Sequence, residues 1–226
     1  MISVCLAAYN GEKHIGAQMA SILASPHVTE LLVSDDGSTD STRAAVAAVA
    51  DSRVRLLGGP ERGVIRNFEF LLGQATGRFI FLSDQDDVWL AHKVDAMLPA
   101  LEEADLVVSD CAIVDAQLNV VTPSFFAARG SGPGLVKNFL RNSFLGCCMA
   151  FRREVLEYVL PFPASVPMHD WWIGLMASRK GRVRFLQEVL VLYRRHAANA
   201  TYAVVSEASL LQQLRWRLRM IGALLA

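Results

Sequence analysis

The stretch Gly77-Arg-Phe-Ile-Phe-Leu-Ser-Asp-Gln-Asp-Asp-Val-Trp89 decides how the rest of the chain is interpreted. Its apolar part, Phe79 to Leu82, is typical of a strand buried on both faces of a sheet. The run ends in three carboxylates, Asp84, Asp86 and Asp87. Open α/β sheets bind ligands at such strand ends, and clustered carboxylates repel one another unless a cation such as Mg²⁺ or Mn²⁺ neutralises them. A solvated acidic turn that caps the next helix is the alternative, so the flanking sequence must decide.

The sequence before this stretch alternates between two apolar patterns. Continuous runs typical of strands alternate with helical spacing: strands at 2–8, 31–34 and 53–57, helices at 15–23, 42–50 and 64–75. Together with the strand at 79–82, this order predicts an α/β fold with a mainly parallel central sheet and helices on both faces. A further strand is expected at 105–109, and small antiparallel elements follow it, because 111–121 alternates like a hairpin.

Three strand ends of this sheet carry side chains suited to a nucleotide. Tyr9 follows the first strand, Asp36 the second, and the acidic cluster the fourth. An aromatic ring, a carboxylate for a base or ribose, and a cation-binding loop together indicate a nucleoside-diphosphate pocket. Taken singly, Tyr9 could be a sheet-edge aromatic and Asp36 a turn residue. The chain lacks GxGxxG after its first strand and lacks GxxxxGK[ST], which excludes a Rossmann dinucleotide site and a P-loop.

These motifs in combination resemble those of family 2 glycosyltransferases with the GT-A fold. The matching segments are Ala7-Ala-Tyr-Asn-Gly-Glu12, Asp35-Asp-Gly-Ser-Thr-Asp40 and Asp84-Gln-Asp-Asp87, a version of the DxD motif. The form Ser83-Asp-Gln-Asp-Asp-Val-Trp89, with Lys93 beyond it, further resembles the rhamnosyltransferase branch. The resemblance implies a GT-A sheet and a nucleotide-sugar donor.

The resemblance also implies roles for individual residues of the first half. Tyr9 and Asp36 would hold the nucleobase, Asp84 the ribose or sugar, and Asp86 a divalent Mg²⁺ or Mn²⁺ bridging the diphosphate. The other residues that it places at the donor are Ala7, Asn10, Glu12, Arg66, Asn67 and Gln85. For Arg66, a solvated helix position is the alternative.

The segment after residue 110 is where the family resemblance places the acceptor. Residues 127–134 concentrate Gly, Ser and Pro, which indicates either a mobile loop over the site or a plain surface linker. Gly146 and Cys147 lie in an apolar segment that resembles the family's acceptor-side lining, although core packing is the alternative interpretation.

Met168-His-Asp-Trp-Trp172 follows a proline-rich connector and supplies the candidate base. An Asp at a helix start is ordinarily a cap. Because the family carries its catalytic base as the Asp of an [EH]-D motif at this point of the chain, the resemblance assigns that role to Asp170. His169, Trp171 and Trp172 are then acceptor-side residues, with one of the two tryptophans packing against a sugar and the other in the core.

The segment Tyr193-Arg-Arg-His-Ala-Ala-Asn199 follows an expected strand at 182–192 and resembles the YRxH segment of the same branch. By that resemblance His196 is a further metal or diphosphate ligand. Arg194 or Arg195 would offset the negative charge of the departing nucleotide. An isolated His in a basic surface loop would otherwise be inert.

Composition agrees with one enzyme-sized domain. The 226 residues are 53% hydrophobic, and 22 basic residues balance 22 acidic ones, so net charge gives no support for a nucleic-acid partner. The four cysteines lack metal spacing and indicate buried thiols in a reducing compartment. With no signal peptide and no apolar run of membrane-spanning length recognised, we expect a cytoplasmic protein, with peripheral contact at the inner face of the membrane as an option.

We expect a glycosyltransferase domain over 1–205, with a donor-binding half at 1–110 and an acceptor and catalytic half at 111–205. Residues 206–226 form a basic amphipathic helix, which either lies on an anionic membrane or packs on the body or a second subunit. Its expected apolar stripe is Leu211, Leu214, Leu218, Ile221 and Leu225.

The resemblance implies inverting, metal-dependent transfer of a hexosyl unit from a nucleotide-diphosphate sugar to a saccharide or lipid-linked acceptor in cell-surface polysaccharide synthesis. The branch points to dTDP-rhamnose as donor. Two alternatives remain: a nucleotidyltransferase acting on sugar phosphates, which should carry a Gly-rich basic loop after its first strand, and a catalytically inactive binding module.

Overall fold

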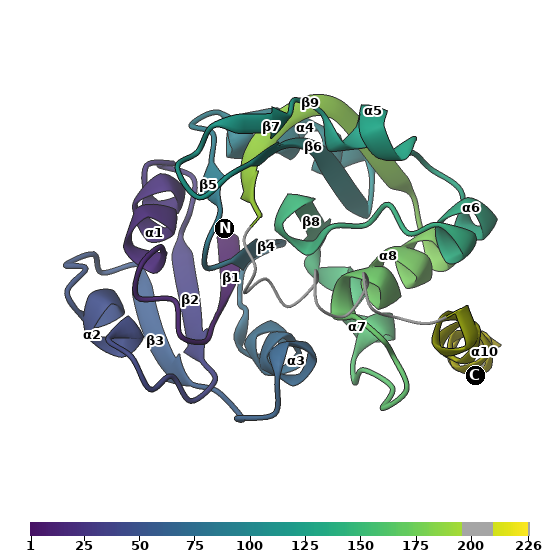
Figure 1. Cartoon of the computed structure of the whole chain (residues 1–226), viewed down its shortest axis with the longest axis horizontal. Helices are drawn as coiled ribbons and strands as arrows, with labels where there is room; N and C mark the ends of the chain where they lie inside the picture. Colours follow the sequence, from purple (N-terminus) through teal and green to yellow (C-terminus); the bar gives the residue numbers. More distant parts are fainter. Residues whose placement is uncertain (196–209, 226) are drawn as a thin grey trace.

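The computed structural model describes residues 1–195 and 210–225. One nine-stranded sheet runs through the molecule in the order β3-β2-β1-β4-β8-β6-β9-β5, with β7 paired to β6 (Figure 1). Its strands are β1 (Ile2–Ala8), β2 (Glu30–Asp35), β3 (Val54–Gly58), β4 (Phe79–Asp84), β5 (Val88–Trp89), β6 (Leu106–Val114), β7 (Val120–Thr122), β8 (Met149–Arg152) and β9 (Val183–Arg194). The longer helices are α1 (Ile15–Leu23), α2 (Thr42–Ala47), α3 (Val64–Gln74), α4 (Lys93–Glu103), α8 (His169–Lys180) and α10 (Leu210–Leu225).

The first half of the sheet is parallel, as the alternating pattern predicts. β1 pairs with β2 and β4, and β2 pairs with β3, all in parallel. The register sets Ala8 opposite Asp35 and Ala7 opposite Asp84. The loops that follow these three strands therefore leave the sheet at one edge.

Helices cover both faces of this parallel part. Figure 1 shows α1 and α2 on one side of β1, β2 and β3, and α3 on the other. The apolar positions with helical spacing are the buried ones, because one stripe of each helix faces the sheet. In α1 and α3 these are Ile15, Met19, Ile22, Phe68, Leu71 and Leu72.

The second half differs from the expected layout in two respects. The expected strand at 105–109 and the first arm of the expected hairpin form one continuous nine-residue strand, β6, to which β7 pairs antiparallel. The sequence predicts no strand at Val88–Trp89. In the structure these two residues form strand β5, which pairs antiparallel with β9. This short strand brings the end of β9 beside the acidic loop.

Two short helices flank the glycine-rich segment. α5 (Phe125–Arg129) precedes it and α6 (Leu135–Leu140) follows it. The buried side chain of Asn138 donates from Nδ2 to the carbonyls of Gly132 and Gly134, both at 2.9 Å. The segment is thus fastened to α6, and mobility over the site stays a prediction.

The C-terminal helix exists as expected but presents a different face to the body. Met220 is fully buried, whereas Leu218 and Ile221 of the expected apolar stripe are 60% and 42% exposed. The reason is the docking geometry, since the Arg217 guanidinium reaches the Leu140 carbonyl at 2.9 Å and fixes the rotation of the helix. No helix within 1–195 or 210–225 combines the length and apolar character that crossing a bilayer requires.

Candidate active site

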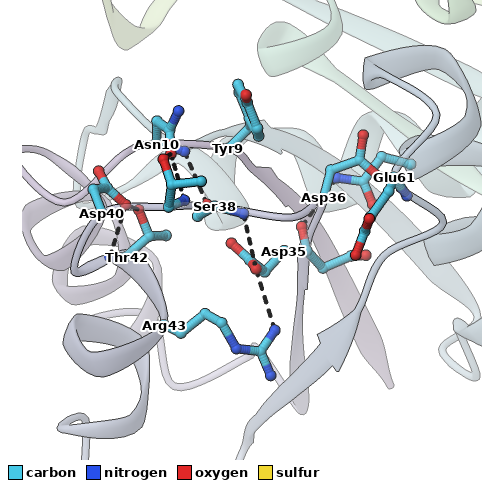
Figure 2. Close-up of polar contacts among 12 residues, drawn as sticks. Tyr9, Asn10, Asp35, Asp36, Ser38, Asp40, Thr42, Arg43 and Glu61 are labelled. Atoms are coloured by element: carbon cyan, nitrogen blue, oxygen red, sulfur yellow. Dashed lines mark hydrogen bonds and ion pairs between the residues drawn. The ribbon is translucent and has the colours of Figure 1, made fainter.

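The loops after β1, β2 and β4 are tied to one another by side-chain amides. Gln85 accepts the Tyr9 N–H at Oε1 and donates from Nε2 to the Tyr9 carbonyl, both at 2.8 Å. A Cβ on Gly11 would lie 2.1 Å from Gln85 Oε1, so any larger residue here would have to displace the Gln85 amide. Asn10 joins the second loop, because its N–H donates to Ser38 Oγ and its Oδ1 accepts the Thr39 N–H (Figure 2).

Tyr9 is the exposed aromatic side chain of this edge. It is 56% exposed at the end of β1, on the loop that Gln85 and Asn10 hold in place. Figure 2 shows the ring standing clear of the loop backbone. An exposed ring held on a fixed loop suits stacking against a planar base.

Asp36 and Glu12 build the edge through backbone contacts. Asp36 accepts the N–H groups of Glu61 and Gly63, both at 2.7 Å, and so fixes the loop between β3 and α3. Glu12 accepts the Ser41 N–H at 2.9 Å. Asp36 therefore acts as a structural turn residue. Each of its carboxylate oxygens still has a further lone pair that a ligand could use.

A hollow beside Asp35 was not anticipated from the sequence. Its lining is Asp35, Gly37, Ser38, Arg43, Gly58, Gly59 and Glu61. Arg43 Nη1 lies 3.2 Å from Asp35 Oδ2, while Asp35 Oδ1 is buried with no hydrogen-bond partner. Figure 2 shows Arg43 approaching from the side of the loop opposite Tyr9. No spacing rule links Arg43 to Asp35, because the contact depends on how α2 docks.

The acidic loop after β4 forms a compact cluster. A carboxylate oxygen of Asp84, one of Asp87 and the Cys147 sulfur all lie within 4.8 Å of one another. Burial, together with the charge of Asp86, raises the pKa of Asp84 to about 8 and that of Asp87 well above its usual value. Asp87 Oδ2 is buried without a hydrogen-bond partner. A hard cation would satisfy such oxygens and relieve the repulsion between them.

Two basic residues support this cluster. Lys93 is completely buried, and its Nζ donates to the Cys147 carbonyl at 2.6 Å and lies 4.1 Å from the centre of the Trp89 ring. Arg194 donates its backbone N–H to Asp87 Oδ1 at 2.9 Å and its Nε to the Asp86 carbonyl at 2.8 Å. Arg194 thus holds the acidic loop directly, next to the β5–β9 pairing, whereas Lys93 binds the neighbouring Cys147 carbonyl.

Asp170, in the first turn of α8, belongs to the same electrostatic environment. Its carboxylate accepts the Gly146 N–H at 3.1 Å and the Trp171 N–H at 2.6 Å. Burial raises its pKa to about 6, and its charge in turn raises the pKa of Asp84. A carboxyl group whose pKa lies this close to neutrality is suited to general-base work.

With this geometry in place, comparison with known proteins decides the family. Residues 3–160 match the family described as Glycosyl transferase family 2. The chain belongs to this family. Among curated relatives of the glycosyltransferase is the Escherichia coli UDP-Glc:alpha-D-GlcNAc-diphosphoundecaprenol beta-1,3-glucosyltransferase WfgD, which is 28% identical over 190 residues, covering 81% of this chain and 72% of WfgD.

Solved structures show the GT-A-like fold of the glycosyltransferase. TarS 1-349 of S. aureus in complex with UDP-GlcNAc superposes with a TM-score of 0.72 at 17% identity, over 97% of this chain and 65% of that chain. Glucosyl-3-phosphoglycerate synthase from Mycobacterium tuberculosis, in complex with Mn²⁺, UDP and glucosyl-3-phosphoglycerate, has a TM-score of 0.65 at 22% identity, over 96% and 79%.

Of the two predicted metal ligands of the glycosyltransferase, the structure describes Asp86 but not His196. His196 lies outside the described residues, so its role stays a prediction. Asp86 is mostly buried beside the cluster, but the group that comes together is Asp84, Asp87 and Cys147. The sequence placed Asp87 in the acidic cluster and Lys93 in the branch motif, but it assigned neither residue a role of its own. The wholly apolar strand before them was a signal that the loop starts inside the protein.

Both tryptophans after Asp170 lie in the core of the glycosyltransferase, as expected for one of them, and packing of the other against a sugar stays a prediction. The Trp171 and Trp172 indole N–H groups donate to the carbonyls of Asn138 and Val159, both at 2.9 Å. The cause is the position of α8, whose residues from His169 to Ala177 are all buried between neighbouring elements.

His169 is also inside, stacked on Phe68 with ring centroids 3.9 Å apart. Neither ring nitrogen has a hydrogen-bond partner, and burial lowers its pKa to about 3, so the imidazole is neutral near pH 7. A Cβ on Gly146 would lie 3.1 Å from His169 Nε2. Gly146 therefore permits the close approach that brings its own N–H to Asp170, and acceptor contact by His169, Gly146 or Cys147 stays a prediction.

The remaining predicted donor residues have structural partners in the glycosyltransferase. Arg66 binds Glu69 and the Phe162 carbonyl, and the buried Asn67 donates to the Ser34 carbonyl at 3.0 Å. α3 turns both side chains toward neighbouring elements, and donor contact by either of them stays a prediction. Ala7 is half-buried within β1, and Arg195 is exposed just beyond β9.

Proposed function

We propose that this family 2 glycosyltransferase moves a hexosyl unit, with inversion, from a nucleoside-diphosphate sugar to a hydroxyl of a saccharide or lipid-linked acceptor. The observation that carries the proposal is the position of Asp170, whose carboxylate accepts the Gly146 N–H at 3.1 Å while the next residue, Cys147, lies with Asp84 and Asp87. The proposed diphosphate site and the proposed base are thus neighbours. Direct displacement requires these two groups and no covalent nucleophile.

For the donor, we assign the base to Tyr9 and the Asp36 loop. The exposed Tyr9 ring offers the stacking face, and Asp36 offers its remaining lone pairs at the neighbouring strand end. Asn10, Glu12 and Gln85 hold these loops in register, as their hydrogen bonds show. We assign the sugar and diphosphate to the side of Asp84, with Arg194 and Arg195 nearby to offset charge.

The residues present fit a divalent cation, Mg²⁺ or Mn²⁺. Most of the candidate ligand atoms are carboxylate oxygens, which hard cations prefer. Asp87 Oδ2 is buried without a hydrogen-bond partner, and a bound cation would neutralise it. Asp84, Asp86 and Asp87 would hold the ion, with His196 as the predicted further ligand. When bound, such an ion stabilises negative charge on a leaving diphosphate. The Mycobacterium tuberculosis neighbour was solved with Mn²⁺ and UDP.

Asp170 is the proposed base. Two N–H donors orient its carboxylate, and the raised pKa of about 6 leaves it largely ionised, yet a competent proton acceptor, at neutral pH. It takes the proton from the acceptor hydroxyl as that oxygen attacks the anomeric carbon. The C–O bond to the diphosphate breaks in the same step, through an oxocarbenium-like state, and the anomeric configuration inverts.

The names of similar proteins guide the choice of donor. WfgD carries UDP-glucose and an undecaprenol-diphosphate acceptor in its name, and TarS was solved with UDP-GlcNAc. UDP-hexoses are therefore the first donors to test. We retain dTDP-rhamnose as the donor that the Ser83 to Trp89 motif favours.

The deciding experiment is a thermal-shift screen of UDP and dTDP sugars with Mn²⁺, Mg²⁺ or EDTA. We expect one nucleotide sugar to raise Tm only when metal is present, and Asp86→Asn to lose that rise. Asp95→Asn is the matched control, since Asp95 is an exposed carboxylate on α4. Metal-independent stabilisation, or an Asp86→Asn variant that behaves like the wild type, would refute the proposed donor site.

A further inference from the structure

Helices α6 and α10 expose large apolar side chains to solvent. Val136 and Leu140 of α6 are 70% and 59% exposed, and Leu218 and Ile221 of α10 are 60% and 42% exposed. Val136 and Leu140 are four residues apart and Leu218 and Ile221 three, so each pair lies on one face of its helix. We name these four side chains, with their basic neighbours, the α6–α10 surface.

The two helices are physically joined. Arg217 of α10 donates from Nη2 to the carbonyl of Leu140, the last residue of α6, at 2.9 Å. Met220, on the other face of α10, is fully buried in the core. Figure 1 shows both helices on the same side of the molecule, next to α8. The two helices therefore belong to one region of the body.

The charged residues within α6 and α10 themselves are all of one sign. Neither α6 nor α10 contains Asp or Glu, and the basic residues on or next to them are Lys137, Arg141, Arg215, Arg217 and Arg219. Elsewhere, exposed arginines pair with carboxylates, as Arg78 does with Glu102 and Arg184 with Glu103. Apolar side chains surrounded by unbalanced basic ones are the composition that binds the surface of an anionic bilayer.

A contrasting patch elsewhere shows that exposure alone does not define the α6–α10 surface. Val120 and Val121 on β7 are 57% and 66% exposed, but 115–122 contains no Lys or Arg. That hairpin lacks the electrostatic component and serves as an internal control.

The α6–α10 surface is one layer of residues away from the candidate base. The inner side of α6 receives the Trp171 indole N–H at the Asn138 carbonyl, and Trp171 directly follows Asp170 in α8. A membrane or protein surface that contacts the outer face of α6 would thus lie close to the proposed acceptor side of the site.

We propose that the α6–α10 surface docks on an anionic phospholipid bilayer, inserting its four apolar side chains among the acyl chains and setting its basic residues against the headgroups. Docking in this way turns the acceptor side of the site toward a lipid-linked substrate, a consequence that rests on the proposed transferase function.

The test is co-sedimentation of the full chain with vesicles of phosphatidylcholine alone or mixed with phosphatidylglycerol, without donor or acceptor. We expect binding to the mixed vesicles only, weakened by added salt. Leu140→Glu with Leu218→Glu should lower the partition coefficient at least tenfold. Lys137→Gln with Arg141→Gln should lower it about 30-fold, because each basic residue near an anionic surface contributes about fivefold. Val120→Glu with Val121→Glu should leave it unchanged.

Equal binding by all variants, or no binding by the wild type, would overturn the proposal. So would dissociation of a dimer by Leu140→Glu with Leu218→Glu at unchanged vesicle binding, since the surface would then be a subunit interface. Nucleotide-induced stabilisation, measured on the same samples, separates this inference from the proposed activity: it should persist in every variant, and its loss in the wild type would refute only the donor site.

Discussion

At the scale of single residues, Asp170 is where a structural and a chemical role can be separated. Asp170→Asn keeps the size of the side chain and one acceptor oxygen but cannot take a proton. We expect turnover to fall by about 10²- to 10⁴-fold. The loss of one N–H contact costs about 1 kcal/mol and is partly offset by removal of a buried charge, so the variant should stay folded. Transfer assays beside urea unfolding measure both, and near-normal turnover would place the base elsewhere.

The raised pKa of Asp170 predicts opposite pH trends for rate and stability. Rate should rise as pH passes about 6, because the ionised form is the base. As pH rises from about 4 to about 6, the contribution of this group to the free energy of unfolding should fall, because the folded protein holds the proton more tightly than the unfolded chain does. Profiles of kcat/KM and of urea midpoints against pH test this, and in Asp170→Asn the contribution of this group to both trends should vanish.

At the scale of elements, Gly146 sets how closely its turn approaches α8. Gly146→Ala adds a methyl group 3.1 Å from His169 Nε2, and His169 cannot retreat freely because it stacks on Phe68. We expect a loss of about 1–3 kcal/mol in stability and a larger fall in kcat than in nucleotide affinity. The control is Gly73→Ala, with open space around it in α3, which should gain up to about 1 kcal/mol. Equal effects of both variants would contradict this packing argument.

The sequence predicted the elements of the first half well because their patterns are local. Continuous apolar runs and helical spacing located β1 to β4 and α1 to α3, and the order of these elements implied the shared sheet edge. The sequence patterns did not predict the two-residue strand β5, nor that two expected strands form the single strand β6. Pairing between β5 and β9 joins residues about a hundred positions apart, and no local pattern encodes it.

The candidate site was predictable only to the level of its loops. Tyr9, Asp36 and the acidic run could be placed at strand ends, but the contacts within them depend on docking. The sequence could not show that Asp87 lies close to Cys147, that Lys93 is buried with its ammonium on the Cys147 carbonyl, or that both tryptophans of α8 are buried. These outcomes are decided by which elements lie across the sheet rather than by residue type.

At the scale of the whole molecule, the sheet crosses the expected boundary near residue 110 without a break, through β4, β8 and β6. We therefore predict a single unfolding transition rather than separate melting of two halves. Arg194→Ala should lower the free energy of unfolding by about 1–3 kcal/mol, because the Asp86 and Ala116 carbonyls lose their hydrogen-bond donor. The control on the same strand is Arg184→Ala, whose exposed pair with Glu103 contributes at most about 1 kcal/mol. Two transitions in urea would contradict this.

The position of Trp89 gives the protein an intrinsic optical probe. Its indole lies two residues beyond Asp87 and 4.1 Å from the Lys93 ammonium, so a cation arriving at the acidic cluster changes the electric field across the ring. The energy of an indole excited state responds to such a field, and we expect the emission maximum to move as Mn²⁺ or Mg²⁺ is added. Trp89→Phe should abolish that movement, although Trp171, Trp172 and Trp216 remain. The fluorescence colour of this chain would then report the occupancy of its own site, without a label.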